Sequence, residues 1–448
     1  MRAGFLRTLL EVPSLPEPIR RSFAREQITQ LTLPPAFALM EGGIVGVLAD
    51  KIYHVEPWLL AVITAAPMFG NLMSFVWSRV ALAKPKVPLI CTLQVGVLLC
   101  IGSVALLPSG RGEGLWLALA MIAARLLMAG VTTVRSVVWS LNYSRELRAR
   151  TTGRLQIISN LITATSSLWA GLALDAAPGN FRYVYVLGVL FGLCGVIAFS
   201  GVRVHSELRH LVKERASNRP AGNRAGRGEQ ASIGFFSILR TDRYYRRYQL
   251  FQFTSGAAAM MLIPSMVHLI SHELRATYVV SFLLLSIAPL MLSVLTMPMW
   301  SYFLDRVHVT EFRARQSVLW IVEFVLLWGG ALAGSLWLIG ASRLVNGISA
   351  GAGNLAWELG HNDFAPKDRV GAYMSVHVTL TGVRGATAPF IGTALYHGWP
   401  QLDALPAFGG IGAHLFAVSA LLSVWTWRGF NVLARDMKQL RDAPPPSP

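Results

Sequence analysis

The chain has 448 residues, of which 53% are hydrophobic and only 14% are charged, and its formal net charge is +17. This composition excludes a soluble globular domain and predicts an integral membrane protein, because several uncharged runs reach the ~20 residues that a helix needs to cross a bilayer. The expected partner of the positive charge is therefore the lipid bilayer and not nucleic acid.

Twelve membrane-spanning helices are expected, six before a basic linker and six after it. The first six cover residues 32–50, 57–78, 87–107, 115–142, 154–175 and 183–202. The second six cover residues 248–270, 277–303, 317–333, 335–360, 371–396 and 409–430. The predicted fold class is an all-α polytopic membrane protein built from two pseudo-symmetric bundles of six helices.

The segments outside these spans are polar and rich in Lys and Arg. They are an N-terminal segment at 1–31, the linker at 203–247 and a tail at 431–448. Within the linker, Ala216–Ser232 has too few apolar side chains to pack and is expected to be flexible. If both termini are cytoplasmic, 32 of the 40 Lys and Arg residues lie on that side and four lie in outer loops. This bias is the positive-inside signature, and it sets the expected orientation.

A repeat at a fixed offset relates the two halves. Subtracting 218 from the stretch Arg343–Tyr396 places Arg343 on Arg125 and Trp357 on Trp139. Each copy consists of two membrane-length segments joined by a charged turn. Tandem halves of this kind are typical of transporter folds.

Eight charged or titratable side chains lie inside the expected spans. A charged group at mid-membrane costs roughly 2.5–3.5 kcal/mol, so each of them needs a partner, a water-filled cavity or a function. The set is Glu41, Arg125, Arg135, Glu323, Arg343, Glu358, His377 and Arg384.

Two of these charges are expected to meet. Glu41 is about nine residues into an outward-running span and Arg125 about ten into an inward-running one, so at ~1.5 Å per residue both lie near mid-bilayer. A Glu41–Arg125 pair is the leading hypothesis for a proton- or substrate-responsive site. The arginine would hold the carboxylate ionised, and protonation would release it. The alternative is a static pair that joins two helices.

Short motifs resemble a known family. Ser301-Tyr-Phe-Leu-Asp305-Arg306 follows the expected eighth span, and Arg125-Leu-Leu-Met-Ala-Gly130 lies in the fourth. With the six-plus-six plan and the basic linker, these motifs resemble the major facilitator superfamily, in which a Gly, three residues and Asp-Arg/Lys mark the turn after the second span of each half. In the first half, Ser78 aligns with the Gly, but Leu82 occupies the position of the acid.

The resemblance implies that spans one, four, seven and ten line a central cavity. Arg343, as the counterpart of Arg125, would then hold the far side of the same ligand. Asn354 and Trp357 fall within roughly 40° of Arg343 around the helix, so they face the cavity if it does. Arginines outnumber glutamates among these cavity residues, which favours an anionic or zwitterionic substrate.

The remaining charges are expected to form gates or to support the spans. By resemblance, Asp305, beside Arg306, would cap a helix N-terminus in the outward-open state. Arg135 is expected to extend towards the cytoplasmic end of its span. For Glu358, an inner gate and a solvated helix end are both compatible with the sequence.

His377 and Arg384 are seven residues apart and share one face of the eleventh span, expected to point towards Glu323 or Glu358. Structural pairing is the favoured role of the two residues. His377 could instead titrate near neutral pH.

The sequence therefore predicts a secondary active transporter of a small organic solute, coupled to protons and working by alternating access in a bacterial inner (plasma) membrane. A monomer without cofactor, metal or catalytic residues is expected, and not an enzyme. One alternative is a non-transporting scaffold or assembly factor with the same fold, which the loss of the acid at Leu82 favours. A remote alternative is an intramembrane serine hydrolase, because Gly347-Ile-Ser349-Ala-Gly351 matches the G-x-S-x-G pattern and His377 could serve as the base.

Overall fold

A computed structural model describes residues 17–205, 207–217, 235–366, 369–401 and 406–442. These residues are helical, apart from turns and one antiparallel bridge between Trp399 and Phe408. Eight of the described helices are long and apolar enough to cross a membrane. The expected all-α membrane fold is therefore confirmed, while 218–232 of the expected flexible linker lies outside the described residues.

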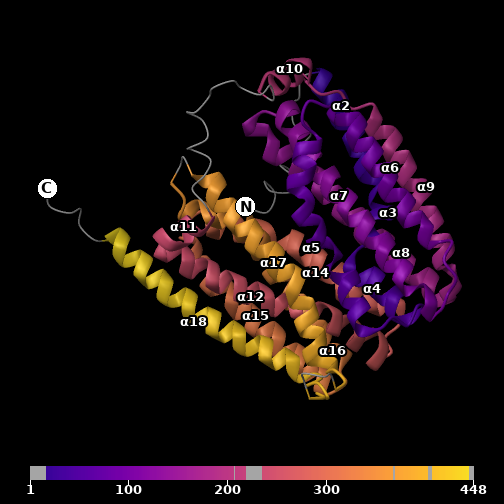
Figure 1. The fold of residues 1–448 in the computed structure, drawn as a ribbon, viewed down its shortest axis with the longest axis vertical. Helices are drawn as coiled ribbons and strands as arrows, with labels where there is room; N and C mark the ends of the chain where they lie inside the picture. Colours follow the sequence, from indigo (N-terminus) through magenta and orange to yellow (C-terminus); the bar gives the residue numbers. More distant parts are fainter. Residues whose placement is uncertain (1–16, 206, 218–234, 367–368, 402–405, 443–448) are drawn as a thin grey trace. The chain divides into compact units, whose positions relative to one another are not determined.

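The chain divides into two units, and the division in the linker falls between residues 221 and 222. Unit 1 comprises Met1–Val55, Ile63–Ala221 and Thr277–Phe282. Its helices are α2 (Glu17–Thr32), α3 (Pro34–Ala38), α4 (Gly42–Lys51), α5 (Pro57–Val80, from residue 63), α6 (Lys86–Val104), α7 (Gly114–Asn142), α8 (Arg145–Ala176), α9 (Phe181–Ser200), α10 (Glu207–Ser217) and α13 (Tyr278–Phe282). All of them except α13 are drawn in indigo to magenta in Figure 1.

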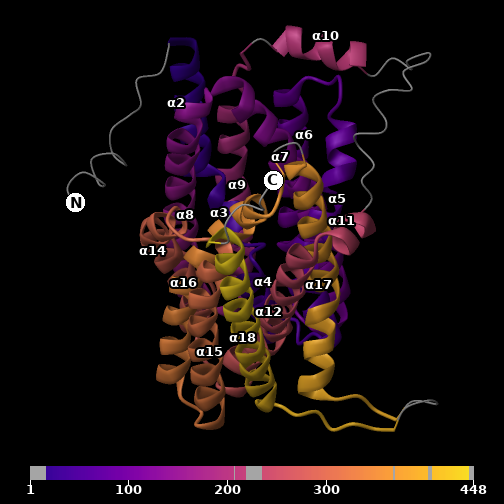
Figure 2. The same cartoon turned by 90° about the vertical axis from the view of Figure 1, so that its left-hand side faces the viewer.

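Unit 2 comprises Glu56–Val62, Gly222–Ala276 and Leu283–Pro448. Its helices are α11 (Phe235–Thr241), α12 (Arg243–His268), α14 (Ala288–Leu304), α15 (Val309–Leu332), α16 (Leu336–Leu359), α17 (Val370–His397) and α18 (His414–Asp442), with short turns of helix at η3 (Leu269–Glu273), η4 (Leu283–Ile287) and η5 (Gly360–Asp363). α18 is the long yellow helix in Figures 1 and 2.

The first span is a broken helix. α3 begins with two prolines and is capped at Leu39, whose backbone N–H donates to the carbonyls of Ala36 and Phe37. α4 begins three residues after Leu39, at Gly42 and Gly43. Between the two helices, Glu41 has extended backbone angles, φ −65° and ψ 135°. Because a mid-membrane break frees backbone groups from the helix ladder, such irregular backbone is found where it lines protein or water and not lipid.

A packed helix precedes this break. α2 begins at Glu17, so part of the segment predicted as a cytoplasmic tail is a helix packed against α8 and α9. The side chains of Phe23 and Glu26 on α2 are almost completely buried. The helical structure at the start of unit 1 therefore begins well before residue 32, where the apolar pattern in the sequence placed the first span.

Close helix approach depends on small residues. A Cβ at Gly70 on α5 would lie 2.7 Å from the carbonyl oxygen of Arg125 on α7. In unit 2, a Cβ at Gly347 on α16 would lie 2.9 Å from the carbonyl oxygen of Pro289 on α14. Without a hydrophobic driving force between helices in lipid, such contacts are a main source of packing energy. They hold the two arginine-bearing helices, α7 and α16, against their neighbours.

Candidate functional site

In unit 1, Glu41 and Arg125 form the ion pair expected from the sequence. Nη2 of Arg125 lies 3.4 Å from Oε1 of Glu41, and the same nitrogen donates a hydrogen bond to the backbone carbonyl of Met40. The arginine thus binds the side chain and the freed backbone of the broken span together. The Glu41 carboxylate makes no capping bond to α4, so it is available to the arginine.

The two partners differ in accessibility. The Glu41 side chain is 47% exposed, whereas that of Arg125 is 13% exposed. Nε of Arg125 is buried and has no hydrogen-bond partner among the described residues. The carboxylate can therefore be reached by water, protons or a solute, while the arginine is fixed by the closely packed α5.

The equivalent arginine of unit 2, Arg343, has a different environment. Nη1 of Arg343 binds Oε1 of Glu323 at 2.9 Å, Nη2 donates to Asn346 at 2.7 Å, and Nε donates to the carbonyl of Leu284 at 3.2 Å. Asn346 also donates to Glu323 at 2.9 Å. Both ionised side chains are more than nine-tenths buried. Arg343 is thus occupied by protein groups, and its proposed contact with a ligand would require this network to open.

Asn354 and Trp357, further along α16, lie beyond that network. Asn354 is exposed, and the half-buried Trp357 donates from its indole to Thr381 at 3.3 Å. The Trp357 ring also lies against that of His377, with centroids 5.5 Å apart. Glu358 is exposed at the end of α16.

The expected direction of His377 and Arg384 was wrong. Glu323 is bound to Arg343. The described side-chain hydrogen bonds of His377 and Arg384 lead instead to α12, while the His377 ring also lies against Trp357 of α16. Arg384 donates to the backbone carbonyl of Gln252, and His377 approaches Gln249 at 3.4 Å. The physical reason is rotational: the shared face of α17 is turned to α12, its closest neighbour in unit 2.

Arg135 has a partner that sequence reasoning missed. Its guanidinium lies 4.8 Å from the centre of the Trp139 ring and acts electrostatically on Glu26 of α2. Glu26 accepts hydrogen bonds from the Trp139 indole and, at 2.8 Å, from the Tyr143 hydroxyl. Arg135 is therefore held inside unit 1 by an aromatic ring and a buried carboxylate.

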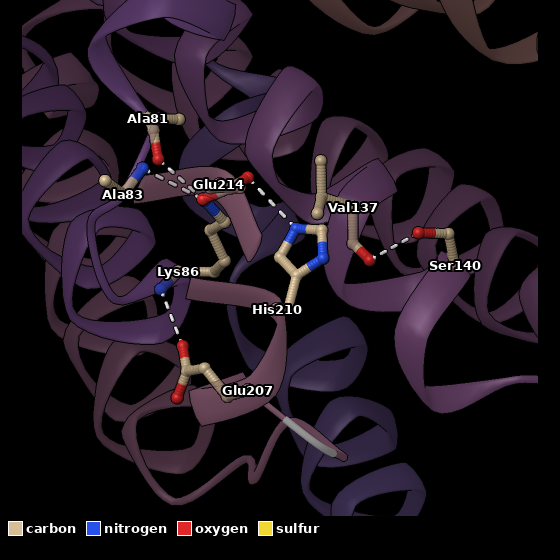
Figure 3. Close-up of polar contacts among 8 residues, drawn as sticks. All are labelled: Ala81, Ala83, Lys86, Val137, Ser140, Glu207, His210 and Glu214. Carbon is tan, nitrogen blue, oxygen red and sulfur yellow. Dashed lines mark hydrogen bonds and ion pairs between the residues drawn. The ribbon is translucent and has the colours of Figure 1, made fainter. Parts of the chain in front are cut away.

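The turn after α5, which lacks the acid at Leu82, receives two acids from elsewhere. Glu207 and Glu214 on α10 accept hydrogen bonds from the backbone N–H groups of Lys86 and Ala83, both at 2.9 Å. Nζ of the buried Lys86 lies 2.8 Å from Glu214 (Figure 3). In Figure 2, α10 lies crosswise to the long helices of its unit. The linker helix thus supplies the negative charge that the turn itself does not carry.

The matching turn in unit 2, between α14 and α15, is also bound by an acid from elsewhere in the chain, Asp363. Asp305 ends α14 and is exposed, and Arg306 donates to the carbonyl of Tyr302 at 2.6 Å. Among the described residues, Asp363 of η5 binds the first N–H of α15, that of Val309, at 2.7 Å. The capping role that the resemblance implied for Asp305 is performed here by Asp363.

The serine-hydrolase motif lies within a regular helix. Gly347, Ser349 and Gly351 are all interior residues of α16, and Ser349 is completely buried. A nucleophile elbow requires a sharp strand-to-helix turn that exposes the hydroxyl. The motif is therefore a pattern of small packing residues.

Solved structures with the same architecture are transporters. A structure of a point mutant of the nucleoside transporter NupG has a TM-score of 0.69 at 11% identity, and the match covers 92% of this chain and 99% of that one. A D-xylose-proton symporter has a TM-score of 0.65 at 10% identity, with 92% and 97% of the two chains covered. No family model and no curated protein matches the sequence. The chain is an integral membrane protein with the major facilitator fold.

Proposed function

We propose that the protein is a secondary active transporter that couples the movement of a small organic solute to protons. The observation that carries this proposal is the Glu41–Arg125 pair at the break in the first span. A scaffold would gain nothing from a half-exposed carboxylate held by an arginine inside a membrane bundle, since such charges are costly and usually functional.

The pair can respond to protonation. When Glu41 is ionised, its attraction to Arg125 adds to the bond between Arg125 and the Met40 carbonyl. A proton on Glu41 removes that attraction and leaves the bond between Arg125 and the Met40 carbonyl. A two-state movement of the broken span can be biased in this way, because a ligand shifts an equilibrium by its differential affinity for the two states.

The solute is proposed to be polar and to carry a negative charge or to be zwitterionic. The two named neighbours are a nucleoside transporter and a D-xylose-proton symporter, which favours a small hydroxylated organic molecule. Arginines inside the spans favour a carboxylate or phosphate group, which guanidinium binds in a bidentate manner.

The proposed location is a bacterial inner membrane, with α10 and the rest of the basic linker in the cytoplasm. The distribution of Lys and Arg along the sequence supports this orientation. Both capped turns, at Lys86 and at Val309, would then lie on the cytoplasmic side.

Transport and scaffolding are distinguished by proton movement. Purified protein would be reconstituted into proteoliposomes that contain a pH-sensitive dye, and nucleosides, pentoses, organic acids and sugar phosphates would be added in turn. We expect at least one class of solute to acidify or alkalinise the lumen and to accumulate along an imposed pH gradient. If no solute is moved and no proton flux is seen, while the protein remains folded, the proposal is wrong and a scaffold is the better account.

A further inference from the structure

Unit 2 contains two buried arginines without a carboxylate partner in the described residues. Arg313 on α15 is 2% exposed and Arg384 on α17 is 5% exposed. The other buried cations described above are paired: Arg343 with Glu323, and Lys86 with Glu214. Arg313 and Arg384 are therefore an exception that needs a physical explanation.

Each of these two guanidinium groups is only partly satisfied. Arg313 donates from Nη1 to Gln316 at 2.7 Å and neighbours the Tyr248 hydroxyl, while its buried Nε and Nη2 have no close hydrogen-bond partner among the described residues. Arg384 donates from Nη1 to the Gln252 carbonyl, while its Nε is buried and has no partner in the part of the chain that the structure describes. The Arg384 side chain also lies directly on Gly256, where a Cβ would be 2.2 Å from the guanidinium carbon. Three guanidinium nitrogens, two on Arg313 and one on Arg384, are thus buried in unit 2 without a close acceptor in the described part of the chain.

Neighbouring groups add donors to the same region. Arg313 acts electrostatically on Arg384, and both act on His377 and Tyr248. Nε2 of His377 is buried and has no hydrogen-bond partner among the residues that the structure describes. α12, α15 and α17 therefore bring two positive charges, an imidazole and a phenol together.

The nearby carboxylates are used elsewhere. Asp363 caps α15 through Val309, and Asp242 binds the N–H of Tyr245 and the hydroxyl of Tyr373, at 2.8 and 2.9 Å. Arginine does not lose its proton in proteins, so deprotonation cannot relieve the two buried charges. An uncompensated buried charge strongly destabilises a fold, whereas an oxyanion bound between two guanidinium groups would compensate it.

A cavity lies close to Tyr248, the phenol that neighbours Arg313. It has a volume of about 500 Å³, and His308, Gly360 and Asp363 are among its lining residues. A Cβ at Gly360 would lie 2.6 Å from the Tyr248 hydroxyl, so Tyr248 is directly behind the cavity wall. Tyr248 therefore neighbours both Gly360, which lines the cavity, and the guanidinium group of Arg313.

From this geometry we propose that Arg313 and Arg384 form a binding site for an oxyanion, the carboxylate or phosphate group of the transported solute, reached past Tyr248. The identification of the anion as part of a cargo rests on the proposed transport function. The binding of an anion does not rest on that function, so a binding experiment and a transport experiment can fail independently.

Binding is tested on the full chain in detergent by thermal unfolding, followed by tryptophan fluorescence. The probes are inorganic phosphate, glycerol phosphate and acetate, each compared with chloride at equal ionic strength. The variants are Arg384→Gln and Arg313→Gln. Arg315→Gln is the matched control, because Arg315 is on the same helix but exposed and paired with Glu311 at 2.7 Å.

We expect at least one oxyanion to raise the Tm of the wild type and of Arg315→Gln in a saturable manner, with chloride inert. Arg313→Gln and Arg384→Gln should lose this rise and should also unfold at a higher temperature than the wild type without anion, because each removes an unpaired buried charge. A response to inorganic phosphate as strong as to the organic anions would assign the site to a free anion and overturn its role for the cargo. Equal shifts in all four proteins, or no shift with any oxyanion, would refute the site.

Discussion

The equivalent arginines of the two halves, Arg125 and Arg343, have opposite environments. Arg125 binds a carboxylate that is 47% exposed, at a break in a helix, over 3.4 Å. Arg343 binds a fully enclosed carboxylate over 2.9 Å and shares it with Asn346. The two arginines at equivalent positions of the repeat thus lie once against a half-exposed carboxylate, where we propose a response to protons, and once in a buried network that joins α15, α16 and η4.

The helix contacts around the two arginines also differ in register. The indole of Trp77 donates to the carbonyl of Leu126, directly after Arg125, at 2.7 Å. The indole of Trp300 donates to Ile348, five residues after Arg343, at 2.9 Å. The crossing point in unit 2 is therefore displaced by about one helical turn of 3.6 residues. This displacement gives each arginine different neighbours despite the common sequence pattern.

The largest expected effect on stability comes from breaking the buried pair of Arg343 and Glu323. Arg343→Met leaves Glu323 buried without its partner and should destabilise unit 2 by about 3–5 kcal/mol. Chemical unfolding in mixed micelles measures this. The double variant Arg343→Met/Glu323→Met is the control and should recover most of the loss. A single variant as stable as the wild type would contradict the description of this pair as structural.

The comparison extends to the two turns whose backbone N–H groups bind carboxylates, the one after α5 and the one before α15. Glu214→Gln weakens the binding of α10 and leaves Lys86 poorly compensated, which should cost about 1–3 kcal/mol. Burial raises the pKa of the Glu214 carboxyl, but the hydrogen bonds from Lys86 and Ala83 and the charge of Lys86 outweigh it, so the pKa lies below its ordinary value of 4.5.

Because the folded-state pKa is depressed, this stabilisation is present above pH 4.5 and is lost as the pH falls through the folded-state pKa. Proteolysis of the linker next to α10, measured as a function of pH, should therefore increase at acid pH in the wild type. In Glu214→Gln it should be fast already at neutral pH. A linker cleaved at one rate in both proteins would show that α10 is not held by this carboxylate.

In unit 2 the start of α15 is bound by two side chains, the N-cap His308, which accepts from the Thr310 N–H, and Asp363, so the loss of one of them should be milder. Asp363→Ala removes the acceptor of the Val309 N–H and should cost about 1 kcal/mol, as for the loss of other hydrogen bonds at a helix N-terminus. Asp305→Ala, at the exposed motif position, is the matched control and should change stability very little. If Asp305→Ala proved the more harmful, the motif acid and not Asp363 would be the cap.

The smallest effect on stability is expected at the Glu41–Arg125 pair. Glu41→Gln removes a partly exposed ion pair and should change the free energy of unfolding by less than about 1 kcal/mol. The same unfolding measurement as for Arg343→Met checks this. A loss as large as that of Arg343→Met would mean that both pairs are structural, and the contrast between the halves would disappear.

Part of this arrangement could be predicted from the sequence. Counting residues from the ends of two apolar spans placed Glu41 and Arg125 at the same depth, and the repeat identified Arg343. Depth follows from the fixed rise of a helix, but the direction of a side chain around the axis does not. For that reason the partners of Arg343 and Arg384 were not predicted correctly.

Two functional candidates were missed for a different reason. Glu26 lies on a stripe of α2 with Ser22, Thr29 and Gln30, which is buried although it is polar, so no apolar pattern marked it. Arg313 was counted as a loop residue, because Glu311 and Arg315 surround it with charge. The structure begins α15 at Val309 and turns Arg313 inward while Arg315 faces outward. Hydropathy alone does not distinguish a buried charge from a solvated one.

Proton-coupled accumulation by Glu41→Gln proteoliposomes is the most direct test of the central claim. With a solute identified in the screen, accumulation driven by an imposed pH gradient would be compared between wild type and Glu41→Gln, with Glu311→Gln as the control, because Glu311 is also half-exposed and paired with an arginine. The account predicts that Glu41→Gln loses accumulation but retains solute exchange across the membrane, while the control behaves as the wild type. Normal accumulation with normal pH dependence in Glu41→Gln would contradict it.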